Sequence, residues 1–377
     1  MRKVGYGSGS GEVGMRGRQN KKEEMTPLGT IGILVDRHVF RRIKSGKTGN
    51  EKLHLYNKAA VEHGLTPVYM CLERTDPSSG ETLGYRFLNG KYVYKILPIP
   101  KVIHNRTLPA SKRMRKRLKQ LAQKRFVFNA QNRYSKYRIH KLLQRRFAAH
   151  LPVTTRYTRS ELRRMMDRFR SLYIKPRSSS LGNGIIKITR NKNGKWIVQS
   201  PRTSFVASKQ KAEAKINDIV KHRNYLIQQT IPLAKYDGNP YDIRVTVQRG
   251  FGGNWQVTGM YCKVARKGRH VTNVAKGGTA KTCDAVFRQH FQHPSRVAQS
   301  VRNVSLQITR YLGKRLNRLA DVGLDMGVDA SGKPYFIEMN GRDQRYGFRK
   351  AKMPDTFRRT YETPVLYAKY VLQTMRR

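Results

Sequence analysis

Five carboxylate side chains of this strongly basic chain lie in one short stretch near its C-terminal end. The protein has 78 Lys and Arg residues against 23 Asp and Glu residues, yet five of those carboxylates fall between Asp321 and Asp343. Apolar residues and glycines surround a central DASGK sequence, which predicts a strand, a turn and a second strand. With a turn over residues 330–333, Asp329 faces Pro334.

The same pairing brings three oxygen-bearing side chains together. Counting outward from the turn, Asp325 faces Glu338, and Glu338 and Asn340 share one face because side chains alternate along a strand. Two carboxylates and an amide oxygen suit Mg²⁺, which binds one or two protein carboxylates and completes its shell with water and substrate phosphate. The stretch therefore predicts a metal site. The alternative is a surface hairpin whose acids are solvated or pair with nearby arginines.

A loop rich in Ser and Gly lies near the middle of the chain. The sequence PRSSSLGNG follows an expected strand at residues 173–175 and precedes a hairpin that turns at Asn193 and Gly194. Such a loop exposes backbone N–H groups that can wrap phosphate oxygens, and the adjacent Lys175 would neutralise their charge. An ordinary connecting loop is the alternative, because loops of this composition between strands are common.

The elements before this loop begin with an α/β pattern. Apolar runs at residues 30–36 and 66–72 predict strands, and residues 51–63 between them predict a helix. A hairpin that turns at Asn89 and Gly90, followed by one more strand, completes the pattern. The apolar positions of the expected helix are Leu53, Tyr56, Ala60 and Val61.

The elements after the loop alternate between helices and antiparallel strands. The strands are expected at residues 225–233, 241–250 and 255–265. The helices are expected at residues 160–172 with Ser160 as N-cap, 208–221, 295–320 and 361–375. The helix at residues 295–320 leads directly into the acidic hairpin. Its apolar stripe consists of Val304, Ile308, Leu312, Leu316 and Leu319.

Length and cysteine content limit the class of protein. A chain of 377 residues accommodates two or three domains, and no apolar run is long enough for a membrane span or a signal-peptide core. We therefore expect a cytoplasmic protein. Three widely spaced cysteines predict neither a disulfide framework nor a zinc site. Residues 1–27, rich in Gly and charge, are expected to form a disordered tail.

The net charge of +55 predicts attraction to polyanions. Nucleic acid bound without sequence specificity, acidic polymers and nucleotide phosphates all fit this charge. Residues 82–160 contain no carboxylate, although Lys and Arg are dense there. The segment is either a set of helices with solvated basic faces or a surface that meets a polyanion.

Seven short motifs follow one another along the last two thirds of the chain. They are NRYSKYRIHKLL, LPVT, YIKPRSSSLGNGI, LIQQTI, DIRV, TNVAKGG and GLDMGVDASGKPYFIEMNGR. In this order they resemble the ATP-grasp superfamily, and most of all its spore-coat-associated YheC/YheD branch. The resemblance implies an α+β fold with two lobes and a nucleotide cleft between them. It divides the chain into the tail, an α/β pre-ATP-grasp domain at residues 28–105, a basic helical connection at residues 106–126 and an ATP-grasp domain at residues 127–377.

The resemblance also implies roles for individual residues. ATP would be bound by Lys136, Lys175, the phosphate-loop residues Ser178, Ser179, Ser180, Gly182 and Gly184, and the hinge residues Gln228, Gln229 and Ile231. Gln229 stands where many members have Glu. The substrate side would be lined by Asp242, Lys263 and Asn273, with Arg244 and Arg266 as catalytic residues, although Lys263 and Arg266 taken singly also fit ordinary surface charge. Mg²⁺, with Mn²⁺ as the alternative, would be held by Asp325, Glu338 and Asn340. Asp321, Asp329 and Asp343 would lie outside the site.

The implied reaction joins a carboxylate to an amine at the expense of ATP. The carboxylate is first phosphorylated, because phosphate leaves an acyl group far more readily than oxide does, and the amine then attacks the acyl phosphate. Positioning and charge neutralisation supply most of the catalysis in phosphoryl transfer, so no nucleophilic side chain is required.

We therefore predict an ATP- and Mg²⁺-dependent carboxylate–amine ligase associated with endospore formation. It would act in the mother cell or at the spore coat, on a carboxylate and an amine that the sequence does not identify. The charge favours an acidic peptide or polymer as substrate. The alternative is a basic structural protein with little or no catalysis that binds spore-coat components, a polyanionic spore layer or nucleic acid.

Overall fold

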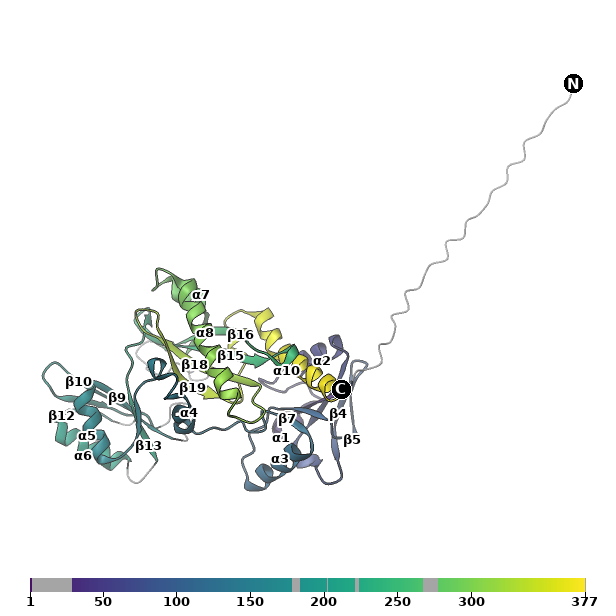
Figure 1. Cartoon of the computed structure of the whole chain (residues 1–377), viewed down its shortest axis with the longest axis horizontal. Helices are drawn as coiled ribbons and strands as arrows, with labels where there is room; N and C mark the ends of the chain where they lie inside the picture. Colours follow the sequence, from purple (N-terminus) through teal and green to yellow (C-terminus); the bar gives the residue numbers. More distant parts are fainter. Residues whose placement is uncertain (2–28, 178–183, 202, 221–223, 267–276, 377) are drawn as a thin grey trace.

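Three β-sheets and the helices packed on them make up the part of the chain that the computed structural model describes (Figure 1). The described residues are 1, 29–177, 184–201, 203–220, 224–266 and 277–376. The combination of helices with one mixed sheet and two antiparallel sheets confirms the predicted α+β class. No helix within these ranges is both long and apolar enough to cross a bilayer. The predicted tail lies outside them, apart from Met1.

The first sheet is formed by the N-terminal strands, in the order β3-β4-β2-β1-β6-β7 with β5 paired to β4. Strands β2, β1, β6 and β7 are parallel, as the α/β pattern predicts. The β4–β5 hairpin turns at Asn89 and Gly90, which both have positive φ, as the two-residue turn requires. The strands are β1 (Gly29–Leu34), β2 (Leu65–Met70), β3 (Thr75–Asp76), β4 (Glu81–Leu88), β5 (Lys91–Pro98), β6 (Val102–Asn105) and β7 (Phe126–Phe128).

The helices of this part are α1 (Arg37–Phe40), α2 (Leu53–Glu62) and α3 (Lys112–Lys124). Helix α2 buries Leu53, Tyr56 and Ala60 as predicted, but Val61 is 62% exposed because it lies one position past the buried stripe. Helix α3 packs Leu118 and Leu121 into the same core as β6 and β7. Helix α3, in the segment predicted as a basic helical connection, therefore packs on the first sheet.

The second sheet has the order β12-β11-β10-β9-β13-β8 and is covered by two helices (Figure 1). Its elements are β8 (Thr154–Arg156), α5 (Arg159–Arg168), β9 (Ser171–Pro176), β10 (Ile186–Arg190), β11 (Trp196–Gln199), β12 (Ser204–Ala207), α6 (Lys209–Val220) and β13 (Tyr225–Gln229). The predicted N-cap of α5 was wrong: the side chain of Thr158, not Ser160, accepts from the Glu161 N–H. Glu161 stands three residues after Thr158, the spacing of a capping box.

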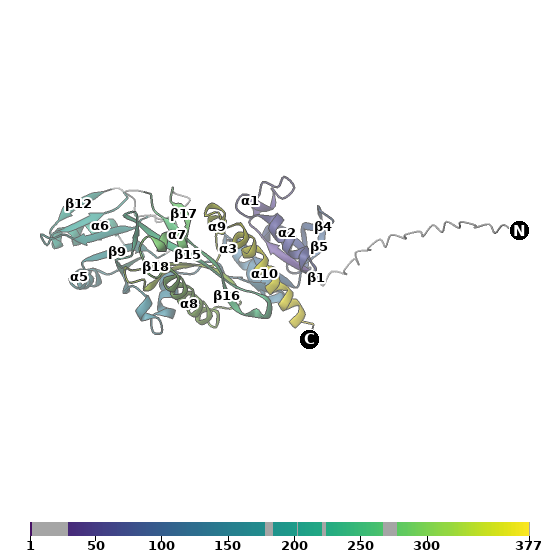
Figure 2. The same ribbon diagram turned by 90° about the horizontal axis from the view of Figure 1, so that it is seen from above.

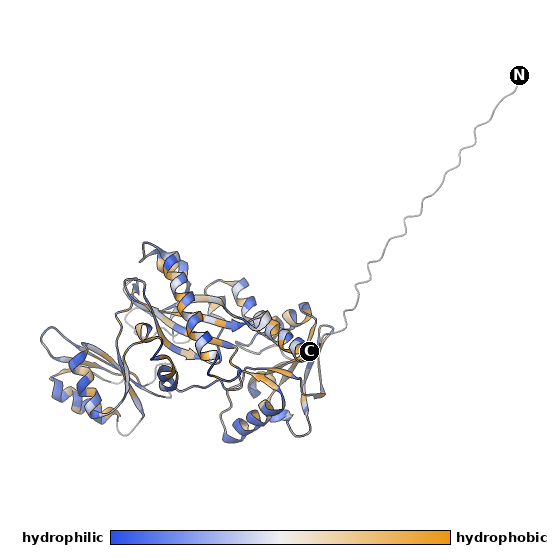
Figure 3. Cartoon of the chain, in the orientation of Figure 1, coloured by the Kyte–Doolittle hydropathy of each residue, from blue (hydrophilic) through white to orange (hydrophobic). Residues whose placement is uncertain are grey.

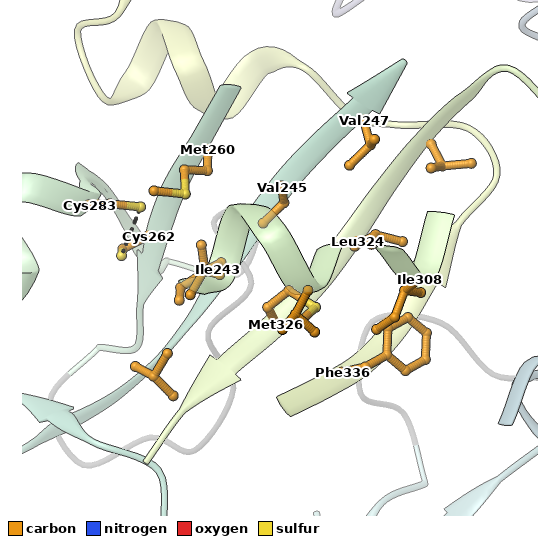
Figure 4. Packing of buried hydrophobic residues seen from close by; sticks show 14 of the residues in the cluster. Ile243, Val245, Val247, Met260, Cys262, Cys283, Ile308, Leu324, Met326 and Phe336 are labelled. Carbon is orange, nitrogen blue, oxygen red and sulfur yellow. Dashed lines mark hydrogen bonds between the residues drawn. The ribbon is translucent and has the colours of Figure 1, made fainter. Parts of the chain in front are cut away.

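The third sheet has the order β17-β16-β15-β18-β19, with β14 paired to β15. Its strands are β14 (Lys235–Tyr236), β15 (Asn239–Arg249), β16 (Trp255–Val264), β17 (Thr279–Thr282), β18 (Asp321–Val328) and β19 (Pro334–Asn340). The helices around it are α4 (Lys136–Leu143), α7 (Cys283–Arg288), α8 (Pro294–Gly313), α9 (Tyr346–Lys350) and α10 (Pro354–Thr374). Figure 4 shows Ile308 of α8 among side chains of β15, β18 and β19, and Cys262 donating a hydrogen bond to Cys283 Sγ at 3.5 Å.

Two of these helices differ in length from the prediction. Helix α8 ends at Gly313, yet Leu316 and Leu319 beyond it still reach the core of the third sheet. Helix α10 begins at Pro354, earlier than predicted, because proline is well accommodated in the first turn of a helix. It packs against both α2 and the third sheet (Figure 2).

A buried polar network fastens the first sheet to the third. Asp321, at the start of β18, pairs with Arg345 and lies 3.1 Å from Nε2 of His104 on β6. Arg345 also donates to the hydroxyl of Tyr56 on α2 at 2.8 Å. Burial lowers the pKa of His104 to about 4, although Asp321 opposes this shift. The network shows that Asp321 has a structural role away from the acidic hairpin's other carboxylates.

Candidate functional site

A cavity opens where the second sheet meets the third. Its lining comes from α4 and the segment before it, from β8, β9 and β13 of the second sheet, and from β19 of the third. The lining residues are Tyr134, Lys136, Ile139, His140, Leu151, Thr154, Lys175, Leu226, Gln228, Phe336, Ile337, Glu338 and Met339. Four predicted site residues, Lys136, Lys175, Gln228 and Glu338, are thus brought together from distant parts of the sequence.

Lys175 is held in this cavity by a chain of hydrogen bonds. Strand β9 pairs with β13, so Lys175 lies opposite Leu226 and near Gln228. Lys175 Nζ donates to Gln228 Oε1 at 2.6 Å, and Gln228 Nε2 donates to Thr154 Oγ1 at 2.8 Å. Burial, aided by the positive charge of Lys136 and opposed by Glu338, lowers the pKa of Lys175 to about 8. An anion in the cavity would therefore meet an ammonium group that lacks a strong counter-ion.

Lys136 and Glu338 form an ion pair at the edge of the cavity. Their side chains are 26% and 27% exposed, and Lys136 Nζ lies 2.7 Å from Glu338 Oε2. Lys136 is the first residue of α4, where the helix dipole already favours negative charge. The pair thus combines a cation and an open carboxylate, which suits a ligand that carries both phosphate and metal.

Apolar and aromatic side chains form the rest of the lining. Tyr134, Ile139, Phe336 and Met339 are among them. His140 lies with them, and burial, together with Lys175 and Lys141, lowers its pKa to about 4. A mostly apolar cavity with a few convergent polar groups is the usual form of a small-molecule site.

The acidic hairpin reaches the predicted pairing by a different route. Val328, not Asp329, faces Pro334, because the turn is one residue longer than predicted: the Asp329 N–H donates to the Lys333 carbonyl. A bulge at Ile337 then restores the register, so that Asp325 does face Glu338. The bulge also explains why Ile337 lines the cavity beside Glu338.

Asp325 lies at the centre of a buried charge cluster. Its Oδ1 lies 2.7 Å from Arg244 Nε and 2.9 Å from Lys263 Nζ. Its Oδ2 accepts from Arg244 Nη2 and from Asn340 Nδ2, both at 3.3 Å. Burial alone would raise the pKa of Asp325, but Arg244 and Lys263 outweigh it and hold the pKa well below the usual range.

Two further carboxylates complete the cluster. Lys263 Nζ lies 2.8 Å from Asp242 Oδ1. Arg244 Nη1 donates to Asp343 Oδ1 at 2.8 Å, and Thr246 Oγ1 donates to Asp343 Oδ2 at 2.5 Å. Asp343, which was predicted to lie outside the site, is fully buried and fixes the guanidinium of Arg244. Three carboxylates and two cations leave the cluster with one net negative charge.

The donor chemistry of Asp325, Glu338 and Asn340 fits a hard cation such as Mg²⁺. Within the described ranges no group of three His, Cys, Asp or Glu residues is arranged to hold a metal, so a site here depends on the Asn340 amide. Of the two carboxylates among these three residues, Glu338 is the more accessible, with its side chain 27% exposed against 8% for Asp325. Both oxygens of Asp325 already accept hydrogen bonds, and it would bind a metal only by releasing one of them.

Other predicted residues lie outside the cavity or outside the described ranges. The Gln229 side chain accepts from the Val153 N–H at 3.3 Å and thereby fixes β13 to the start of β8. Ile231 is half-buried beyond the end of β13, and Arg266 is exposed past the end of β16. Gly184 has φ 74°, and a Cβ there would lie 3.1 Å from Pro176 Cγ. Ser178, Ser179, Ser180, Gly182 and Asn273 fall outside the residues that the structure describes.

Several lining residues lie within the motifs of the family resemblance but were given no role there. Thr154 ends LPVT, His140 lies in NRYSKYRIHKLL and Phe336 lies in the acidic hairpin, yet nothing in these motifs distinguishes them from their neighbours. Their place in the cavity depends on how the second sheet sits against the third. Asp343 could have been found, since it follows the ligand pair Glu338 and Asn340 at short spacing.

Comparisons with known proteins agree with this arrangement. A family model for the YheC/D like ATP-grasp domain matches residues 124–371. Endospore coat-associated protein YheD of Bacillus subtilis (strain 168) is 28% identical over 311 residues, which cover 78% of this chain and 67% of YheD. YheC of the same organism is 20% identical over 228 residues, which cover 59% of this chain and 62% of YheC. The chain thus spans about two thirds of the length of these curated relatives.

A solved structure shows the same fold. D-alanyl-alanine synthetase A from Vibrio cholerae superposes with a TM-score of 0.53 at 10% identity, covering 93% of this chain and 100% of that one. The family match spans well over half of the chain and includes every cavity residue. The chain belongs to the YheC/D-like ATP-grasp family.

Proposed function

We propose that this protein is an ATP- and Mg²⁺-dependent carboxylate–amine ligase that works through an acyl phosphate. The observation that carries the proposal is the convergence of Lys175, Lys136 and Glu338 on one cavity between two sheets. A protein that acted only through its surface charge would need no buried lysine held in place by Gln228 and Thr154. The cavity therefore favours an enzyme over a basic structural protein.

The lysines of the cavity would bind the phosphates of ATP. Lys175 is poised by one short hydrogen bond and is only partly neutralised, so a phosphate oxygen can replace Gln228 as its partner. If Glu338 binds a metal, its ion pair with Lys136 would break, and Lys136 could then pair with a phosphate of ATP. The apolar lining around Phe336 and Met339 would receive the adenine. Preorganised cations of this kind stabilise the charge of a transferring phosphoryl group.

The charge cluster around Asp325 would hold the metal and the carboxylate substrate. Glu338, Asn340 and Asp325 would hold Mg²⁺, which would supply charge neutralisation for the phosphates of ATP. The cluster's net negative charge attracts a divalent cation. Arg244 uses three of its five N–H donors on Asp325 and Asp343, so two remain to orient the substrate carboxyl group.

The names of the relatives support a role at the endospore coat. Because YheD and YheC are described as coat-associated, we place this protein in the mother cell or at the coat of a developing spore. A chain of net charge +55 would retain an acidic peptide or polymer more readily than a neutral substrate. We therefore propose an acidic acceptor as the carboxylate substrate.

Binding of ATP as a function of Mg²⁺ tests the proposal. Calorimetry with wild-type protein should show ATP binding that strengthens at least tenfold when Mg²⁺ is added. Glu338→Gln should lose this dependence, because the open carboxylate of the metal set is gone. Glu362→Gln is the matched control, since Glu362 pairs with His63 and Arg358 outside the cavity. Equal and metal-independent binding by all three proteins would contradict the metal assignment.

A further inference from the structure

Helix α3 carries a concentration of positive charge that the proposed ligase site does not use. Seven of its 13 residues are Lys or Arg, and it contains no acid. Arg115 and Arg117 donate to the backbone carbonyls of Ala110 and Leu72, at 2.8 and 3.0 Å. Over most of its length the helix is coloured hydrophilic in Figure 3. No ion pair within the described ranges involves a side chain of α3.

Four cations form a continuous exposed face of this helix. Lys112, Arg113, Lys116 and Lys119 are exposed, and in the part of the chain described here they have no hydrogen-bond partner. At 100° per residue these positions fall within one arc, opposite Leu118 and Leu121, which fix the helix to the first sheet. We call these four residues the α3 face. It is built on a packed core and does not depend on the nucleotide cavity.

The charges of the α3 face work against the stability of their own helix. Lys112 and Arg113 occupy the first turn, where the helix dipole disfavours cations, and no acid accompanies them there. Lys112 and Lys116 stand four residues apart, and Lys116 and Lys119 three apart, so like charges repel along the face. A bound polyanion would remove both penalties. The arrangement is therefore better suited to a complex than to the free protein.

We propose that the α3 face binds the phosphate backbone of duplex nucleic acid without reading its sequence. The helix is about 20 Å long at about 1.5 Å per residue. A duplex presents about 12 phosphates over that length, at one charge per about 1.7 Å. Polar, strongly positive surfaces are typical of protein–DNA interfaces.

An acidic protein fits the α3 face less well. Protein–protein interfaces have an apolar centre, and none of the exposed large apolar side chains lies on α3. Among the described residues, these side chains are Met1, Val61, Leu88, Val93, Tyr94, Ile96, Val206, Phe251 and Met375. The face thus offers charge without an apolar anchor, which matches a phosphate backbone.

A charge-matched pair of variants tests this proposal in the full chain. The first replaces Lys112, Arg113, Lys116 and Lys119 with Gln, a good helix former. The second replaces Arg296, Arg302, Arg310 and Lys314, on and just after α8, with Gln. Both lose four positive charges, but only the first loses the α3 face. Fluorescence anisotropy with a 20-base-pair DNA duplex of arbitrary sequence measures binding at several salt concentrations.

The α3 variant should bind the duplex at least tenfold more weakly at 0.1 M salt. Its salt slope should fall by about 3 to 4, because each phosphate contact contributes about 0.9. Its thermal unfolding should stay at or above the wild-type midpoint, since repulsion in the first turn is relieved. Equal losses in the two variants would overturn the proposal, because they would show that net charge alone matters. Poly-glutamate serves as a second probe in the same assay. If the α3 variant loses poly-glutamate binding but keeps duplex binding, the proposal is also overturned, in favour of an acidic protein partner.

Discussion

Lys175 keeps its charge at a place where burial works against it. Its side chain is 9% exposed, and its hydrogen-bond partner Gln228 is neutral. Lys263 shows the contrasting case: burial would lower its pKa, but Asp242 and Asp325 raise it instead. The two lysines therefore differ in their electrostatic surroundings. Lys263 is neutralised by two carboxylates of the protein, and we propose that Lys175 binds a phosphate of ATP.

This difference makes nucleotide affinity sensitive to pH. The form of Lys175 that binds phosphate is the charged one, and its pKa in the free protein is lowered to about 8. Affinity for ADP should therefore fall as pH rises through 8, and at pH 9 it should be about one tenth of its value for the fully charged lysine, because about one tenth of the lysine stays charged there. Titrations between pH 7.5 and 9.5 lie above the range in which phosphate itself titrates.

Lys175→Arg supplies the comparison, because arginine stays charged throughout this range. The affinity of this variant for ADP should not change with pH over this range, even if it differs from the affinity of the wild type. If the variant and the wild type decline in parallel, Lys175 is not the group that titrates.

Some residues of the candidate site could be predicted from the sequence, and others could not. Lys175 and Glu338 belong to motifs with a fixed order, so they could be assigned before the fold was seen. Gln228 and Gln229 were both predicted as hinge residues, but only Gln228 lines the cavity, because adjacent strand residues point to opposite faces. Only the sheet fixes that choice.

At the scale of elements, the β18–β19 hairpin shows two deviations that cancel. The turn is one residue longer than predicted and contains Gly332, whose φ of 82° is a backbone conformation that favours glycine. The second strand contains one extra residue, at the bulge at Ile337. Because the two changes cancel, the pairing counted from a four-residue turn still predicted the correct partner of Asp325, Glu338. Bulges depend on tertiary packing, so sequence patterns do not predict them.

Strand β18 also needs a glycine beside the charge cluster. A Cβ on Gly323 would lie 2.3 Å from Asp343 Oδ1 and 3.1 Å from Arg244 Cδ. Gly323→Ala should therefore lower the free energy of unfolding by about 1–3 kcal/mol, as overpacked buried sites do. Chemical denaturation measures this loss.

A double-mutant cycle identifies the cause of that loss. In an Asp343→Ala background the carboxylate that meets the new methyl group is absent, so Gly323→Ala should cost less than about 0.5 kcal/mol. An undiminished cost in that background would place the strain elsewhere in β18.

At the scale of the whole molecule, the chain separates its charges. The cluster around Asp325 and the junction network around Asp321 bury carboxylates together with cations, while helices such as α3 present cations to the outside. The order of elements, the class of fold and the family could be predicted from the sequence. The particular residues that meet between the second and third sheets could not all be predicted, because they depend on contacts between segments far apart in the chain.

The central claim is that the cavity directs the terminal phosphate of ATP to a carboxylate. Trapping with hydroxylamine tests it directly, because hydroxylamine replaces the unknown amine and converts an acyl phosphate into a stable hydroxamate. The protein would be incubated with ATP, Mg²⁺, hydroxylamine and glutamate-rich peptides, and ADP and hydroxamate would be quantified by mass spectrometry. We expect equimolar ADP and hydroxamate from the wild type, with at least a hundredfold less from Lys175→Ala. ADP formed together with free phosphate, in the absence of any hydroxamate, would contradict carboxylate activation.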